Sequence, residues 1–264
     1  MQQLNLNIDN GLATVTLNRP EKKNALSEIL FDELFEVGSN LQKTEHLRAV
    51  ILTGAGDDFC AGIDLKFLQT LLPRLEEVRV KMRNPATGEL ANWFQRPCYI
   101  WRQLNVPVIA AIEGICIGAG LQLALSADVR LAGPSTRMGI MEAKWGLIPD
   151  MGITQALPQL MRADQAKELM MTARILDAKT SEQAGLITRV VNNPLAAAKD
   201  LAKEIMGQSP EAVNGSKALI DQTWNLLPGS GLAIEAQIQS EIMGSPNQIE
   251  AVLAGMAKRP AKFK

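Results

Sequence analysis

Two glycine-containing loops carry residues that could bind a developing negative charge. CAGID at 60–64 and GAG at 118–120 each follow an apolar run and precede a predicted helix. The first turn of a helix has unpaired N–H groups and the positive end of the helix dipole, and glycine lets a ligand approach the backbone. Two such turns facing one point would form an oxyanion hole, in which each donor contributes about 3–4 kcal/mol. Each loop taken alone fits an ordinary strand-to-helix turn better, since short glycine motifs are weak evidence of a binding site.

Gln122 is the first polar side chain of the helix predicted after the second loop. Its amide can donate and accept hydrogen bonds, but it cannot relay a proton at neutral pH. Any acid or base that works beside this loop must be another residue. A Ser-His-Asp or Cys-His nucleophile would have to be built on His46, the one histidine of the chain, whose surroundings indicate a surface residue. Cys60 is typical of a small core side chain.

Composition excludes several classes of protein. The chain has 264 residues, 47% of them hydrophobic and 21% charged, and a net charge of −1, so it lacks the basic excess of a nucleic-acid-binding protein. Its three cysteines form no CxxC pair, and clustered metal ligands are absent from the sequence, so we expect neither a disulfide framework nor a metal site. No apolar stretch reaches about 18 residues, and no targeting signal is evident, which predicts a cytoplasmic protein without membrane contact.

The apolar pattern predicts an α/β fold with largely buried parallel strands. A hairpin at Asn10-Gly11 joins strands at 4–8 and 12–17, and a helix begins after Ser27 as N-cap. Further strands are predicted at 49–53, 106–112 and 128–132, with the stretch that starts at residue 116 read as helix. Beyond about residue 195 only helices are predicted, one of them beginning at Ser209 and another covering 248–258. Prolines break residues 66–105, where we expect a helix near 64–72 and then an irregular, lid-like segment.

Several motifs in order give the chain a resemblance to the crotonase superfamily, the enoyl-CoA hydratase and isomerase family. They are NRPEKKNAL at 18–26, LTGAGDDFCAGIDLK at 52–66, PVIAAIEGICIGAGLQLALSADVRLA at 107–132, MEAKWGLIPDMGITQ at 141–155 and AKRPAKF at 257–263. The resemblance implies a spiral of ββα units with a C-terminal helical region, assembled as a homotrimer or a dimer of trimers. We therefore expect a core with the acyl-CoA site over residues 1–195 and a helical trimerisation region over 196–264.

The resemblance also implies a site for an acyl-CoA thioester, with coenzyme A as part of the substrate and no other cofactor. The oxyanion hole of the family falls on the backbone N–H groups of Ile63 and Ala119. The matching substrate-binding and CoA-binding positions are Arg19, Lys22, Lys23, Ala25, Ala61, Asp64, Leu65, Lys66 and Gly118. The basic residues among 18–26 fit a contact with the nucleotide end of CoA, and they fit a solvated charged turn equally well.

The catalytic positions of the family are matched only in part. Its hydratases place two glutamates beside a water molecule; the second matches Glu142, whereas the first matches Gln122. Its dienoyl-CoA isomerase branch has a carboxylate at the position of Asp150, although that branch also has an acid at the position of Gln122. Apolar neighbours would desolvate Glu142 and Asp150, and their like charges would raise at least one pKa, so one could act as base and the other as acid.

Three functions remain open from the sequence. The first choice is an acyl-CoA double-bond isomerase that uses Glu142 and Asp150, with the enolate held by Ile63 and Ala119. The alternative is an enoyl-CoA hydratase in which Glu142 alone activates water and Gln122 positions it. A third is a non-catalytic protein that binds CoA esters. A Rossmann domain is a weaker competitor, because GAGDDF and GAGLQL lack the third glycine of GxGxxG.

Overall fold

A twisted sheet of six strands forms the centre of the computed structural model, which describes residues 1–226 and 228–264. Only β1 and β2 are antiparallel; every other neighbouring pair is parallel, as the apolar runs predicted. In spatial order the strands are β1 (Leu4–Asp9), β2 (Leu12–Leu17), β3 (Ala49–Gly54), β4 (Val108–Ile112), β6 (Val129–Ala132) and β9 (Arg189–Val190). The expected α/β fold is thus confirmed.

The two faces of this sheet bury different side chains of the same strands. Val50 and Leu52 of β3 belong to the main core, whereas Ala49 and Ile51 pack with Ala198 on the opposite face. Alternate strand residues point to opposite faces, so both sets must be apolar, which explains the unbroken run AVILT. The helices α1 (Glu28–Leu41) and α4 (Arg96–Arg102) contribute to the core on the face of Val50 and Leu52. Helix α9 (Pro194–Met206) covers the opposite face.

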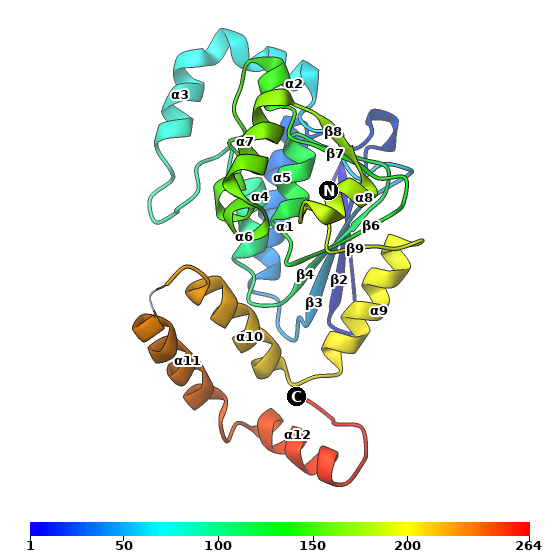
Figure 1. Ribbon diagram of the computed structural model, residues 1–264, viewed down its shortest axis with the longest axis vertical. Coiled ribbons are helices and arrows are strands. Elements are labelled where there is room, and N and C mark those ends of the chain that lie inside the picture. The colour runs from blue at the N-terminus through cyan, green and yellow to red at the C-terminus, as the bar shows by residue number, and fades with distance from the viewer. Residues whose placement is uncertain (227) are drawn as a thin grey trace.

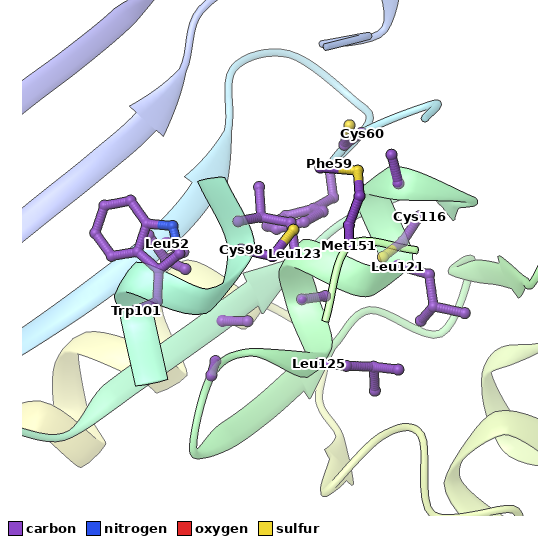
Figure 2. Packing of buried hydrophobic residues seen from close by; sticks show 14 of the residues in the cluster. Leu52, Phe59, Cys60, Cys98, Trp101, Cys116, Leu121, Leu123, Leu125 and Met151 are labelled. Carbon is purple, nitrogen blue, oxygen red and sulfur yellow. The ribbon is translucent and has the colours of Figure 1, made fainter. Parts of the chain in front are cut away.

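A smaller sheet lies beside the first and corrects one prediction. It contains β5 (Ile115–Ile117), β7 (Arg137–Gly139) and β8 (Ile175–Asp177). Residues 116 and 117 were expected in a helix, but they are extended, and helix α5 (Ala119–Leu125) begins only after Gly118. A short apolar run does not distinguish a strand from a buried helix by its period. Every residue of α5 is buried, and Figure 2 shows its Leu121, Leu123 and Leu125 in the same cluster of buried side chains as Cys98 and Met151.

The predicted ends of two early elements are confirmed. Asn10 and Gly11 both have positive φ, at 49° and 84°, as a two-residue hairpin turn of type I′ requires. The Ser27 hydroxyl accepts a hydrogen bond from the Leu30 N–H at 3.2 Å and caps α1.

The segment expected to be irregular after residue 72 is helical over 72–83 and 96–102, and residues 84–95 between these helices are irregular as predicted. Helix α2 (Leu65–Leu71) confirms the helix predicted near 64–72, with Asp64 as its N-cap, but a short 3-10 turn (Leu72–Arg74) leads directly into α3 (Leu75–Arg83). Pro73 occupies that 3-10 turn, so it separates two helices rather than preventing them. Helix α3, which is highly charged and buries only Val78, was missed because the prolines were read as breaking the whole segment.

Helices dominate the remainder of the chain. They are α6 (Leu157–Leu160), α7 (Ala163–Thr172), α8 (Ala178–Gln183), α10 (Pro210–Thr223), α11 (Pro228–Ile242) and α12 (Pro246–Met256), with further 3-10 turns at Pro20–Lys22, Glu142–Trp145 and Ile153–Gln155. Figure 1 shows α9 against the sheet, whereas α10, α11 and α12 extend beyond it. The Ser209 cap of α10 is confirmed. Among the described residues, no helix is long and apolar enough to cross a membrane.

Candidate active site

The two glycine-containing loops lie side by side. Leu26 donates to the Gly62 carbonyl at 2.8 Å and accepts from the Asp64 N–H at 2.9 Å, so the intervening Ile63 N–H points away from this pairing. The Cys60 N–H donates to the Ile115 carbonyl at 2.9 Å, which joins the first loop to β5, the strand that leads into the second loop. These bonds hold the backbone on both sides of Ile63.

Glycine permits this close approach at Gly62 and Gly118. A Cβ on Gly62 would lie 3.1 Å from the Ile117 carbonyl oxygen and 3.7 Å from the Ala119 nitrogen. Gly118 has φ 55° and ψ −126°, a conformation open mainly to glycine, and it turns the chain from β5 into α5. Ala119 is the first residue of α5, so its N–H has no acceptor within the helix. The geometry thus offers Ile63 and Ala119 as neighbouring backbone donors.

Both backbone donors and all three candidate catalytic side chains line one cavity of ≈ 680 Å³. Ile63, Ala119, Gln122, Glu142 and Asp150 all line it. Apolar side chains supply much of the rest of its wall; they include Phe31, Leu68, Leu71, Leu75, Val78, Met82, Phe94 and Ile148. The cavity therefore combines an apolar interior with a few convergent polar groups, which is typical of a small-molecule site.

Gln122 contacts Glu142 directly. Its Nε2 donates to Glu142 Oε1 at 2.7 Å, and its Oε1 accepts from the Met151 N–H at 2.8 Å. The other oxygen of the carboxylate, Glu142 Oε2, is buried without a hydrogen-bond partner in the part of the chain that the structure describes. An unpartnered buried carboxylate oxygen is costly, so it is a strong acceptor for a proton or a substrate group.

Both carboxyl groups of the cavity have a perturbed pKa. Burial raises the pKa of Glu142, and the charge of Asp150 raises it further, while hydrogen bonds including that from Gln122 oppose the shift. Burial also raises the pKa of Asp150. Both side chains are half-buried, as their apolar neighbours in the sequence suggested. Raised values bring carboxyl groups closer to the range in which they exchange protons at neutral pH.

The predicted CoA-binding residues fall into two groups. Ala61, Leu65 and Gly118 line the cavity. The others do not line it: Arg19 forms an ion pair with Asp64 at 2.9 Å, Ala25 is half-buried, and Lys22, Lys23 and Lys66 are exposed. Lys23 is still close to the site, because its carbonyl accepts from the Ala61 N–H at 2.9 Å.

The remaining candidate nucleophiles are a buried thiol and a surface histidine, as the sequence predicted. Burial raises the pKa of Cys60 to about 12, so its thiol stays protonated, and His46 is exposed as predicted. Across the described residues, no group of three or more His, Cys, Asp or Glu side chains could hold a metal ion.

The contribution of α3 to the cavity was missed by sequence reasoning. Leu75, Val78 and Met82 all line it. Their spacing of three and then four residues is the signal of one helix face, and it could have predicted this helix.

Comparison with known proteins agrees with this geometry. A family model described as enoyl-CoA hydratase/isomerase matches residues 7–264. The mitochondrial methylglutaconyl-CoA hydratase of Mus musculus is 34% identical over 261 residues, which cover 96% of this chain and 80% of that protein. A peroxisomal Delta(3,5)-Delta(2,4)-dienoyl-CoA isomerase of Arabidopsis thaliana is 31% identical over 270 residues, covering 97% of this chain and 94% of that protein. A crystal structure of enoyl-CoA hydratase from Bacillus anthracis superposes with a TM-score of 0.90 at 31% identity, covering 100% of this chain and 99% of the other.

Proposed function

This chain belongs to the enoyl-CoA hydratase/isomerase family of the crotonase superfamily, and from that premise we propose that it is a double-bond isomerase of enoyl-CoA thioesters. The observation that carries the choice of isomerase is that Glu142 and Asp150 line one cavity together with Ile63 and Ala119, whereas Gln122 cannot transfer a proton.

The proposed reaction moves one proton off the substrate and another onto it. The thioester oxygen accepts hydrogen bonds from the Ile63 and Ala119 N–H groups. One carboxylate removes the α proton, the C–H electron pair moves into the thioester enolate, and the protonated carboxyl adds its proton at the γ or ε carbon. The substrate keeps its mass, and Glu142 and Asp150 exchange protonation states. Raised pKa values favour this exchange, because they allow one carboxyl group to hold a proton while the other is ionised.

Exposed lysines support binding of a phosphate-bearing CoA end outside the cavity. Lys66 follows Leu65, which lines the cavity, and Lys23 is hydrogen-bonded to Ala61, which also lines it. With Lys22 beside it, this surface would attract phosphates through charge. The homotrimer or dimer of trimers, residues 196–264 as its contact region, coenzyme A as the only cofactor-like group and a cytoplasmic location stay predictions.

The proposal is tested with two substrates. The purified protein is incubated with a 3,5-dienoyl-CoA and, separately, with a 2-enoyl-CoA, and both absorbance and product mass are followed. Growth of the 2,4-dienoyl chromophore without a change of mass is expected. Glu142→Gln and Asp150→Asn should each reduce this rate by about 10²–10⁴-fold, the usual contribution of a general acid or base, while CoA-ester binding persists. Full activity of Asp150→Asn would remove the second proton carrier and refute the isomerase assignment.

A hydratase is the second candidate, and the methylglutaconyl-CoA hydratases favour it, since the one from Mus musculus is 34% identical whereas the dienoyl-CoA isomerase is 31% identical. Addition of one water to the 2-enoyl-CoA, with no 2,4-dienoyl product, would support it, with Glu142 as the sole carboxylate. No reaction of either substrate, together with tight CoA-ester binding, would favour the non-catalytic binding protein.

A further inference from the structure

Among the described residues, Gln122 is the side chain that is hydrogen-bonded both to the Glu142 carboxylate and to the backbone N–H of Met151, the residue after Asp150. The amide is 4% exposed and sits on α5, whose residues are all buried. The Met151 N–H can only donate, so the amide oxygen must face Met151 and the amide nitrogen must face Glu142. The orientation of Gln122 is therefore fixed by chemistry.

With Gln122 in this orientation, the two carboxylate oxygens of Glu142 differ in their hydrogen bonding. Oε1 accepts from Gln122 at 2.7 Å, whereas Oε2 is left buried without a partner among the described residues. The donated hydrogen bond favours the ionised carboxylate, and it leaves Oε2 as the atom that can take a proton.

The other end of the amide acts on Asp150. The hydrogen bond to Met151 at 2.8 Å fixes the peptide unit that follows Asp150, in a segment without strand or helix. A hydrogen bond from the backbone N–H of Asp150 lowers the pKa of its own carboxyl, against the effect of burial, so the backbone at 150–151 helps to place this side chain.

We propose that Gln122 is a positioning residue that sets the roles of the two carboxyl groups: it holds Glu142 ionised as the base and holds the backbone that places Asp150 as the acid. The assignment of Glu142 as base and Asp150 as acid rests on the proposed function. The contacts themselves do not depend on which reaction the protein catalyses.

Other titratable groups also face Glu142. Asp150 and Lys144 line the same cavity, and burial raises the pKa of the Cys98 thiol of α4, with the charges of Asp150 and Glu142 raising it further. None of these donates to the Glu142 carboxylate in the structure, so Gln122 is the side chain whose loss should change its titration most.

Two variants separate the two ends of the amide. Gln122→Met removes both hydrogen bonds and keeps a side chain of similar length. Gln122→Glu keeps an acceptor for the Met151 N–H and replaces the donor to Glu142 with a second carboxylate. Gln42→Met makes the same chemical change at an exposed position beyond α1 and serves as the matched control.

The readouts are taken on the ligand-free protein, so they stand even if the isomerase assignment fails. The carboxyl of Glu142 is titrated by ¹³C NMR, with Glu142→Gln identifying its signal, and exchange of the Met151 amide is followed in parallel. Gln122→Met should raise the pKa of Glu142 and speed Met151 exchange. In Gln122→Glu, the new carboxyl and that of Glu142 should lose their second proton at a still higher pH, because the two negative charges repel each other. Exchange of the Met151 amide should stay slow.

Kinetics then connect the contacts to turnover. In Gln122→Met the acid limb of the kcat/KM profile should move to higher pH, and kcat should fall by about 10²-fold with little change in KM, as expected of a misplaced catalytic group. Unchanged Glu142 titration and unchanged Met151 exchange in this variant would overturn the proposal and leave Gln122 as a core side chain. A shift of the same size in Gln42→Met would also overturn it.

Discussion

Arg19 Nη2 lies 2.9 Å from Asp64 Oδ2, and this ion pair joins the turn before α1 to the residue that directly follows Ile63. Arg19 also donates to the Ala25 carbonyl at 2.6 Å, and Asp64 caps α2 through the Lys66 N–H at 2.8 Å. Each side chain of the pair is only 14% exposed. Arg19, which the family resemblance placed among CoA contacts, is in this structure part of the support for the Ile63 loop.

Replacing Arg19 with Met should therefore lower stability and also disturb the donor loop. Loss of the hydrogen-bonded partner of a largely buried carboxylate should cost about 1–3 kcal/mol at pH 7, measured by urea unfolding. Arg162→Met, which breaks an ion pair whose side chains are 75% and 64% exposed, should change stability by less than about 1 kcal/mol. Equal losses in the two variants would contradict a special role of the Arg19 pair.

The stability difference should depend on pH in a defined direction. Burial favours the neutral acid, but hydrogen bonds from Arg19 and the Lys66 N–H outweigh it and hold the pKa of Asp64 below its ordinary value. A lowered folded-state pKa stabilises the protein above the unfolded value of about 3.9, and this contribution is lost as the pH falls through the folded value. The gap between wild type and Arg19→Met should shrink below about pH 4; a constant gap would exclude the ion pair as its source.

The two carboxyl groups that we propose as acid and base should act on stability in the opposite direction. Burial raises the pKa of both Glu142 and Asp150, so their favourable contribution is complete below the unfolded values and is lost as the pH rises through the folded ones. Glu142→Gln and Asp150→Asn should each raise stability at pH 8 by roughly 0.5–2 kcal/mol, at the cost of activity, and the gain should vanish below about pH 4. The exposed Glu45→Gln is the control for calorimetry at both pH values. A gain that persists at low pH would argue against burial as its cause.

The first five strands of the large sheet and the two glycine-containing loops could be predicted because their signals are local. The apolar run at 49–53 requires burial on both faces, and each glycine-containing loop follows such a run. The boundary at 116–118 could not be predicted in the same way. Cys116 and Ile117 become a strand because Cys116 pairs with Met138 of β7, and that partner is distant in the sequence.

The hydrogen bonds between the side chains of the site could not be predicted from the sequence. Glu142 and Asp150 were identified through family resemblance, but no pattern in one sequence indicates that Gln122 accepts from Met151 or that Glu142 keeps one oxygen unpartnered. The resemblance also assigned Arg19 to CoA, since spacing alone does not reveal that Asp64 occupies its guanidinium.

Gly118→Ala tests the backbone geometry of the donor at Ala119. The added Cβ would meet Glu142 Oε1 at an ordinary 3.7 Å, so the strain comes from φ 55° and ψ −126° and not from a clash. Relief of that strain would turn the Ala119 N–H, and loss of one oxyanion donor should lower kcat by about 10²–10³-fold. Gly88→Ala is matched in kind, because φ is +84° and nothing lies within 4 Å of its Cβ. It should lose stability and keep kcat; a similar loss of kcat in both variants would show that strain alone is responsible.

Two valines on opposite sides of α3 offer a test of the acyl cavity. Val78 is 7% exposed and lines the cavity, whereas Val80 is 58% exposed and does not line it. Val78→Trp fills space that an acyl chain would use, so KM should rise for a long-chain dienoyl-CoA and stay nearly constant for a short-chain one. Each excluded methylene loses about 0.8 kcal/mol, so exclusion of two should raise KM by about tenfold where KM reports binding. Val80→Trp adds the same side chain to the solvent face and should leave both KM values unchanged. If Val78→Trp affects short and long chains equally, the acyl chain does not run along α3, and the apolar face of that helix serves only to hold it on the core.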